Sequence, residues 1–252
     1  MAKQSKLPPK EKPQGRDHIF NVDRNAPLST SKLVGFIVGR LADIPLQYYI
    51  LTYYSGSFWK LVGLPVRHPS AITGVLSPRQ TMLLAFSAVA ALRHAYWAIS
   101  FSFCDIPVPA IVFFNALFST VNSLLLARDS SWDLSYLDYA AIGLFTVGSL
   151  IETVSEYQRN AFKKNPANKG KIYTDGLFGL ARHINYGGYV IWRGGYALGS
   201  GSAFALVQPV FQLYDFYSRA VPELDQHMSA KYDDQWKTYK KKTPFVLIPA
   251  VL

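Results

Sequence analysis

Long apolar blocks alternate with short polar stretches along most of the chain. The four longest blocks each approach the roughly 20 residues that a helix needs to cross a bilayer. They are residues 33–54, 80–103, 106–127 and 137–154. Two shorter blocks follow at 186–199 and 203–217, separated by a glycine-rich turn that predicts a tight helical hairpin. Charge is nearly absent inside the long blocks, whereas a soluble helix carries a polar stripe on its outer face. The pattern therefore predicts an all-α, multi-pass transmembrane bundle of about six spans.

Lysine and arginine collect outside these blocks, in the N-terminal tail and in segments 159–182 and 219–242. The positive-inside rule places all three regions in the cytosol, together with both termini. Residues 1–31 lack the apolar stretch of a cleavable signal peptide and are predicted to be a disordered basic tail. The formal net charge of +10 therefore indicates contact with anionic lipid headgroups rather than with nucleic acid. The loop 55–79 does not fit this topology. It is basic, yet the count of six spans places it on the side opposite the cytosol.

A few ionisable residues interrupt the apolar blocks. The second block contains Arg93, His94 and Tyr96, and the first contains Arg40 and Asp43. Such a group costs roughly 2.5–3.5 kcal/mol near the middle of a membrane helix, so each needs a partner or a cavity. Two interpretations stay open: the polar groups of the two helices pair with each other, which is favoured, or His94 or Tyr96 donates a proton to a substrate.

The densest polar cluster lies at residues 176–189, at the entry to the predicted hairpin, in the stretch GLFGLARHINYGGY. Arg182, His183, Asn185 and Tyr186 fall within about one helical turn. Together they supply hydrogen-bond donors, an acceptor, a planar cation and a ring face. At the mouth of a membrane helix, this combination indicates a site for an anionic cofactor or substrate.

Further cations precede and follow the hairpin. Arg159 and Lys163 are four residues apart, so on one continuing helix they share a face. Lys163, Lys169, Lys171 and Arg182 could surround a phosphate, or this basic segment could form a loop that contacts only lipid headgroups. After the hairpin, Arg219 and Glu223 are also four apart; the acid either binds a ribose hydroxyl or simply pairs with Arg219.

Several common site signatures are missing. The sequence contains no GxGxxG after a strand, no GxxxxGK[ST], no HExxH and no GxSxG. The single cysteine, Cys104, rules out an intramolecular disulfide and a cysteine-based metal site, so no metal site is predicted. A nucleotide, if bound, is held by another kind of pocket.

The last hundred residues resemble the C-terminal domain of the steroid 5α-reductase and sterol reductase superfamily, which also includes isoprenylcysteine and phospholipid methyltransferases. The resemblance consists of a glycine, an Arg-His-x-x-Tyr motif, a hairpin, an acid, and an aromatic stretch that ends in Ile-Pro. The matching residues are Gly176, Arg182, His183, Tyr186, Glu223, Tyr232, Trp236, Tyr239, Pro244, Ile248 and Pro249.

This resemblance implies a multi-pass enzyme of the endoplasmic reticulum membrane, with a nucleotide cofactor in the cytosolic mouth of the hairpin. Residues 32–154 would form the transmembrane substrate side, and residues 155–252 would form the cofactor domain. The implied cofactor contacts are Arg159, Lys163, Phe178, Arg182, His183, Asn185, Tyr186, Arg219, Glu223 and Tyr239.

Three functions follow from the resemblance and stay open. Sterol reductases show Arg-His-x-Asn-Tyr, as this chain does, whereas the methyltransferases typically have a proline where Ile184 stands. The leading hypothesis is therefore an NADPH-dependent reductase of a carbon–carbon double bond in a sterol, terpenoid or enoyl-lipid. The alternatives are an S-adenosylmethionine-dependent methyltransferase acting on a lipid or prenylated cysteine, and a non-enzymatic lipid-binding protein. The oligomeric state is not predicted.

Overall fold

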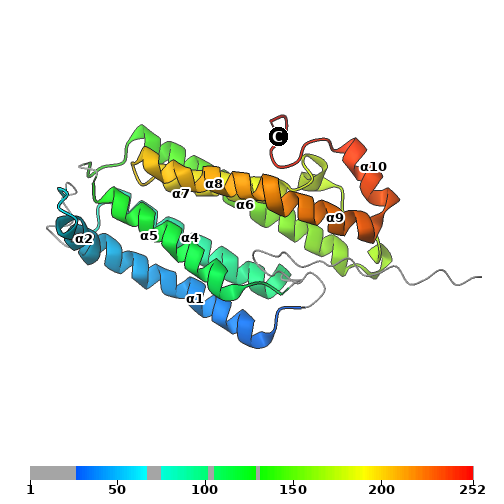
Figure 1. Cartoon of the computed structure of the whole chain (residues 1–252), viewed down its shortest axis with the longest axis horizontal. Helices are drawn as coiled ribbons and strands as arrows, with labels where there is room; N and C mark the ends of the chain where they lie inside the picture. The colour runs from blue at the N-terminus through cyan, green and yellow to red at the C-terminus, as the bar shows by residue number, and fades with distance from the viewer. Residues whose placement is uncertain (1–26, 67–74, 102–104, 129–130, 252) are drawn as a thin grey trace, which may run out of the picture.

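The computed structural model describes residues 27–66, 75–101, 105–128 and 131–251, and every element within these ranges is helical (Figure 1). This confirms the predicted all-α class. The predicted disordered tail lies almost entirely outside the described residues, as does Cys104. The long helices run side by side, and the C-terminal helices gather at one end of the bundle (Figure 1).

The helices occupy all six predicted blocks. In chain order they are α1 Thr30–Tyr49, the π-helical turn η1 Ile50–Tyr54, α2 Ser55–Leu61, α4 Pro78–Phe101, α5 Val108–Leu126, α6 Tyr136–Lys164, the 3-10 turns η2 Pro166–Asn168 and η3 Gly176–Gly179, α7 Ile184–Leu198, the 3-10 turn η4 Ala203–Leu206, α8 Val207–Asp215, the π-helical turn η5 Phe216–Ala220, α9 Val221–Tyr232 and α10 Asp234–Lys242. The second arm of the hairpin differs from the prediction: helix α8, η5 and α9 follow one another directly, so the arm extends fifteen residues past the predicted end at 217.

Three of these helices, α4, α5 and α6, are long and apolar enough to cross a membrane, as far as the described residues were searched. This agrees with a multi-pass membrane protein. Helix α1 is 20 residues long but carries Arg40, Asp43 and Gln47, which lower its mean hydropathy. The hairpin helices α7 and α8 are shorter, with 15 and 9 residues. The count of six spans stays a prediction.

Helix α6 begins where its sequence provides a cap. The Ser135 side chain accepts a hydrogen bond from the Asp138 backbone N–H, while the Asp138 carboxylate accepts from the Ser135 N–H at 2.8 Å. This reciprocal pair satisfies amides that a helix N-terminus leaves without partners. Asp138 is also fully buried and ion-paired with Arg79 of α4 at 3.0 Å. The start of α6 is therefore fixed against α4.

Helices α6 and α7 pack with their backbones in contact. A Cβ atom built on Gly148 of α6 would lie 2.3 Å from the Trp192 backbone nitrogen. A Cβ on Gly195 of α7 would lie 2.5 Å from the Phe145 nitrogen. Small residues allow membrane helices to approach this closely, and dispersion and weak backbone contacts then stabilise the pair. The pair carries part of the candidate site, including Arg159 and Asn185.

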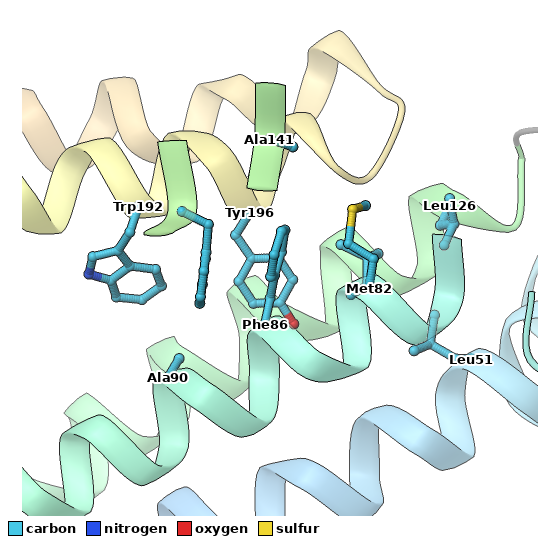
Figure 2. Close-up of a cluster of buried hydrophobic side chains, with 10 residues drawn as sticks. Leu51, Met82, Phe86, Ala90, Leu126, Ala141, Trp192 and Tyr196 are labelled. Atoms are coloured by element: carbon cyan, nitrogen blue, oxygen red, sulfur yellow. The ribbon is translucent and has the colours of Figure 1, made fainter. Parts of the chain in front are cut away.

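Aromatic rings join this helix pair to α4 (Figure 2). The rings of Phe86 and Phe145 stack with centroids 4.1 Å apart, and Tyr196 meets both edge-on. Trp192 and Tyr196 are completely buried. Large buried rings contribute much of the packing energy in such a core. The cluster therefore fixes the position of α7 relative to α4 and α6.

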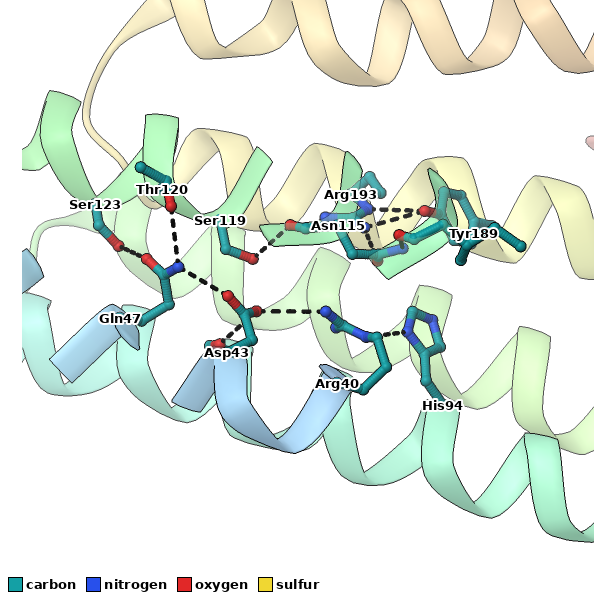
Figure 3. A network of polar contacts seen from close by, with 12 residues as sticks. Arg40, Asp43, Gln47, His94, Asn115, Ser119, Thr120, Ser123, Tyr189 and Arg193 are labelled. Atoms are coloured by element: carbon teal, nitrogen blue, oxygen red, sulfur yellow. Dashed lines mark hydrogen bonds and ion pairs between the residues drawn. The ribbon is translucent and has the colours of Figure 1, made fainter. Parts of the chain in front are cut away.

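A buried polar network connects α1 to its neighbours (Figure 3). Asp43 accepts hydrogen bonds from Gln47 at 2.8 Å and from Ser87 at 3.1 Å. The Arg40 Nε donates to His94 Nδ1 at 3.1 Å, which agrees with the favoured pairing of the first and second helices. The neighbouring Arg93 departs from that expectation, because it points to α6 instead of α1 and binds Glu152 there.

Candidate functional site

Two adjoining cavities lie on either side of α7. The first, here the polar pocket, has a volume of about 350 Å³ and is enclosed by α6, η3, the start of α7, α9 and α10. The second, here the apolar pocket, has a volume of about 380 Å³ and is enclosed by α1, α4, α5, α7, α8 and η5. Five residues line both pockets: Trp97, Glu152, Tyr186, Tyr189 and Phe216. The two cavities therefore share a wall.

The structure brings most of the predicted cofactor residues together around the polar pocket. Those that line it are Arg159, Lys163, Phe178, Arg182, His183, Asn185, Tyr186 and Tyr239. Their role in binding a cofactor stays a prediction.

The remaining predicted residues lie elsewhere. Arg219 lines the apolar pocket, and Glu223 lines neither cavity. The Arg219 guanidinium lies 2.6 Å from Asp215 and 3.9 Å from Glu223, so its principal partner is the aspartate. His94 lines the apolar pocket, whereas Tyr96 lines neither of the two cavities and is 47% exposed.

The α6 wall of the polar pocket is held by a chain of contacts. Because α6 continues to Lys164, Arg159 and Lys163 share one face, as predicted from their spacing. Arg159 is ion-paired with Glu156, and its guanidinium lies 5.7 Å from the centre of the Phe178 ring. The other oxygen of Glu156 accepts a hydrogen bond from the Asn185 amide at 2.8 Å. Asn185 therefore orients Glu156 and, through it, Arg159.

The C-terminal segment folds back onto the Arg-His motif. The backbone N–H groups of Arg182 and His183 donate to the carbonyls of Phe245 and Val246, at 3.0 and 2.8 Å. The Arg182 Nη1 also donates to two carbonyls of this segment, at 2.7 and 2.9 Å. A Cβ on Gly187 would lie 2.1 Å from the carbonyl oxygen of Leu247. The motif and the tail thus form one unit at the rim of the pocket.

Two buried donors at the pocket have no partner among the described residues. They are the Nε atoms of Arg159 and Arg182. A buried N–H without an acceptor is costly, so an anionic or carbonyl group of a ligand would relieve both. The pocket also has more cations than carboxylates in its lining: Arg159, Lys163, Arg182 and Lys231 against Glu152 and Glu156. Phosphate oxygens suit this donor set.

Tyrosines contribute neutral donors to the same pocket. The Tyr239 hydroxyl donates to the Phe178 carbonyl at 2.5 Å. Burial raises the pKa of Tyr239 above its usual value, and burial likewise raises the pKa of Tyr232. Both phenols are therefore protonated at neutral pH. Tyr239 thereby fixes η3, which holds the Phe178 ring at the pocket.

Sequence reasoning missed the carboxylates of the site. Glu152 lines both pockets and accepts hydrogen bonds from Arg93 at 2.5 Å and from the Trp192 indole at 2.6 Å. Glu152 and Glu156 precede Arg159 and Lys163 at helical spacings of four, three and four residues. That periodicity, which places all four on one face, was the signal available in the sequence.

The fold and the pocket define a multi-pass helical membrane protein with a polar site at the end of its bundle. Residues 90–243 match the family described as protein of unknown function (DUF1295), and the chain belongs to this family. Its relatives include sterol reductases and an isoprenylcysteine methyltransferase, which confirms the suspected steroid 5α-reductase-like superfamily.

The relatives are enzymes of two kinds. The chain is 33% identical over 231 residues to the probable O-methyltransferase ustE of Ustilaginoidea virens, covering 82% of this chain and 80% of that protein. It is 25% identical over 123 residues to a probable 7-dehydrocholesterol reductase of Acanthamoeba polyphaga mimivirus, covering 42% of this chain and 27% of the reductase. It is 24% identical over 110 residues to the protein-S-isoprenylcysteine O-methyltransferase of Schizosaccharomyces pombe, covering 42% and 47% of the two chains.

Proposed function

We propose that this protein is a membrane-embedded reductase that binds NADPH in the polar pocket and reduces a carbon–carbon double bond of a hydrophobic substrate in the apolar pocket. The observation that carries the proposal is the pair of adjoining cavities, one rich in cations and one rich in aromatic side chains, with a shared wall. A hydride donor and an apolar acceptor need this arrangement, because the reacting atoms must meet while their remaining parts lie in different surroundings.

The residues present fit a phosphorylated nucleotide. The unpartnered Nε atoms of Arg159 and Arg182 would donate to phosphate oxygens, and Lys163 and Lys231 would add positive charge. The Phe178 ring offers a face on which a flat base or nicotinamide can stack. NADPH supplies a hydride when bound. The chain's own side chains would hold the nucleotide beside the five residues that line both pockets.

The same proposal assigns an orientation in the membrane. The basic segments 159–182 and 219–242 border the polar pocket, and basic segments favour the cytosolic side. The protein would then lie in the endoplasmic reticulum membrane. Its polar pocket would open to the cytosol, and both chain termini would lie on the cytosolic side. The bilayer and a hydrophobic substrate are the proposed partners.

Two adjacent lysines offer a matched test. Both lysines are exposed, but Lys163 lines the polar pocket and Lys164 does not. In the purified full chain in nanodiscs, Lys163→Gln should weaken NADPH binding about tenfold through the loss of a charged contact, and Lys164→Gln should leave it within about twofold. If the two variants bind NADPH with equal affinity, the polar pocket is not the NADPH site.

The second candidate is a methyltransferase that uses S-adenosylmethionine in the same pocket. It is favoured by the relative ustE, which is similar over four-fifths of both chains and thus includes the substrate side. The carboxylates Glu152 and Glu156 also suit the ammonium and sulfonium charges of that cofactor. Thermal unfolding with each cofactor separates the candidates. A ligand at 100 times its Kd stabilises by about 2.7 kcal/mol.

Each outcome of this comparison is informative. Stabilisation by NADPH together with loss of substrate supports the reductase. Stabilisation by S-adenosylmethionine alone replaces it with the methyltransferase. A chain that responds to neither cofactor is a lipid-binding protein that retains the fold.

A further inference from the structure

Among the described residues, Arg193 on α7 has no carboxylate partner, unlike the arginines of α1 and α4. Those others each have a carboxylate oxygen within 3.5 Å; they are Arg40, Arg79 and Arg93. Arg193 is only 3% exposed, and its hydrogen bonds go to the neutral side chains of Tyr189 and Asn115. A buried cation without a counter-ion is costly in a membrane protein and commonly marks a functional site.

Tyr189 lies between Arg193 and the apolar pocket, because it binds Arg193 and also lines that pocket. The Arg193 Nε and Nη2 atoms donate to the phenol oxygen at 3.1 and 3.0 Å (Figure 3). A phenol oxygen accepts at two positions and donates once, so both acceptor positions are filled. No hydrogen bond within the described part of the chain uses the hydrogen of this hydroxyl. Tyr189 lines the apolar pocket and can therefore donate to a ligand there.

The other charged or titratable side chains at this pocket already have partners. They pair as His94 with Arg40, Glu152 with Arg93, and Asp215 with Arg219. The His94 ring also stacks with that of Tyr189, with centroids 6.4 Å apart. Tyr186, on the same helix as Tyr189, faces both pockets and is uncharged. The unmatched charge near the pocket is therefore the positive charge of Arg193.

The shape of the ligand follows from the rest of the lining. Aromatic rings enclose the apolar pocket from six helical elements; they are Phe36, Trp97, Phe114, Phe118, Tyr186, Tyr189, Phe211 and Phe216. Flat conjugated molecules stack on such rings and fill the space between them better than a flexible chain does. A cavity of about 380 Å³ lies within the usual range for small-molecule sites.

We infer that the apolar pocket binds a flat aromatic molecule through an acidic oxygen, a phenol or an enol, that accepts a hydrogen bond from Tyr189 and faces the positive charge of Arg193. The inference rests on the proposed function only in taking this pocket as the substrate side. A preorganised donor backed by a buried cation stabilises negative charge on the bound oxygen. The pair Tyr189 and Arg193 is thus the specificity-determining group of the pocket.

The test compares 2-naphthol with naphthalene, which differ by one hydroxyl. Equilibrium dialysis against the full chain in nanodiscs, with empty nanodiscs as the baseline, gives the saturable binding of each. The intact chain should bind 2-naphthol about tenfold more tightly, and Tyr189→Phe should abolish this preference. Tyr139→Phe is the matched control, because Tyr139 is 60% exposed and lies outside both pockets; it should keep the preference.

Absorption spectroscopy provides a second readout that a merely structural role would not change. The bound 2-naphthol should ionise about one pH unit lower than in empty nanodiscs, and Arg193→Gln should remove this shift. Equal binding of the two probes by the intact chain, or a hydroxyl preference that survives Tyr189→Phe, would overturn the inference. NADPH binding is measured separately on the same samples. If the intact chain binds NADPH but shows no preference for 2-naphthol, only this inference is wrong. If it prefers 2-naphthol but does not bind NADPH, only the proposed reductase is wrong.

Discussion

At the scale of single residues, the polar pocket is built from side chains that other side chains hold in place. Arg159 is oriented by Glu156, which is in turn held by Asn185 on a different helix. Tyr239 of α10 is bound to the backbone of Phe178 in η3. The contacts of Asn185 and Tyr239 cross between elements, so a change in either residue is expected to alter a neighbour's position as well as its own interactions.

The hydroxyl of Tyr239 gives a pH-dependent prediction. Burial raises its pKa above the ordinary value of 10.0, so the unfolded chain ionises first as the pH rises. Stability should therefore fall above about pH 10, because the unfolded state then binds fewer protons than the folded state. Tyr239→Phe should lower stability by about 1 kcal/mol at pH 8, through the lost hydrogen bond, and should reduce the fall at higher pH.

Melting temperatures in nanodiscs between pH 8 and pH 11 check this prediction. Tyr157→Phe is a suitable control, because Tyr157 is 59% exposed and should behave like the unaltered chain. If Tyr239→Phe and Tyr157→Phe lose stability in parallel as the pH rises, burial of Tyr239 does not govern the alkaline limit.

At the scale of elements, the pairing of α6 with α7 determines where the site residues meet. Gly148, Gly188 and Gly195 allow the two backbones to touch. This pairing sets Glu152 of α6, which lines both pockets, beside Trp192 of α7. The stacked rings of Phe86 and Phe145 then connect the pair to α4. The helix interface therefore has a direct effect on the geometry of the site.

Two neighbouring glycines on α7 test this interface. A Cβ on Gly195 would lie 2.5 Å from the Phe145 nitrogen and 2.6 Å from the Ala141 oxygen, whereas one on Gly194 would meet nothing within 4 Å. Gly195→Ala should destabilise the protein by about 1–3 kcal/mol, because backbone atoms cannot move aside cheaply. Gly194→Ala should be neutral or stabilising by up to about 1 kcal/mol. Unfolding in nanodiscs measures both, and equal stabilities would contradict the proposed backbone contact.

At the scale of the whole molecule, the end of the chain completes the polar pocket. Backbone carbonyls of residues 243–246 hold Arg182 and His183, and Leu247 is fully buried against the start of α7. The described C-terminus thus lies beside the hairpin entry that precedes it by some sixty residues. A site assembled in this way requires the entire C-terminal domain.

Truncation tests this dependence. A chain that ends at residue 242 should bind the proposed nucleotide at least tenfold more weakly, because Arg182 loses the carbonyls that orient it. A chain that ends at residue 250 removes Val251, which is 76% exposed, and should bind normally. Helical content by circular dichroism should stay similar in both. Normal binding by the shorter chain would show that the tail does not support the site.

Local patterns in the sequence were sufficient for the helices and for two groups of residues in the candidate pocket. In a bilayer, a long apolar run must satisfy its own backbone hydrogen bonds and does so as a helix; all six blocks are helical. Arg182 to Tyr186 fall within one turn, and Arg159 and Lys163 share one face of one helix. Such short-range relations do not depend on the rest of the fold. They therefore place the residues within each of these two groups together without knowledge of the tertiary structure.

Tertiary structure alone decided which faces look inward. His94 and Tyr96 are two residues apart on α4 and so point in nearly opposite directions, and only packing against α1 and α7 shows that His94 reaches a pocket. The same holds for Arg193, which has no carboxylate partner among the described residues; this emerges only when helices distant in sequence pack around it. Helical periodicity is a local property of the sequence. The partner of a buried charge comes from a helix that is distant in sequence, so it is known only from the tertiary structure.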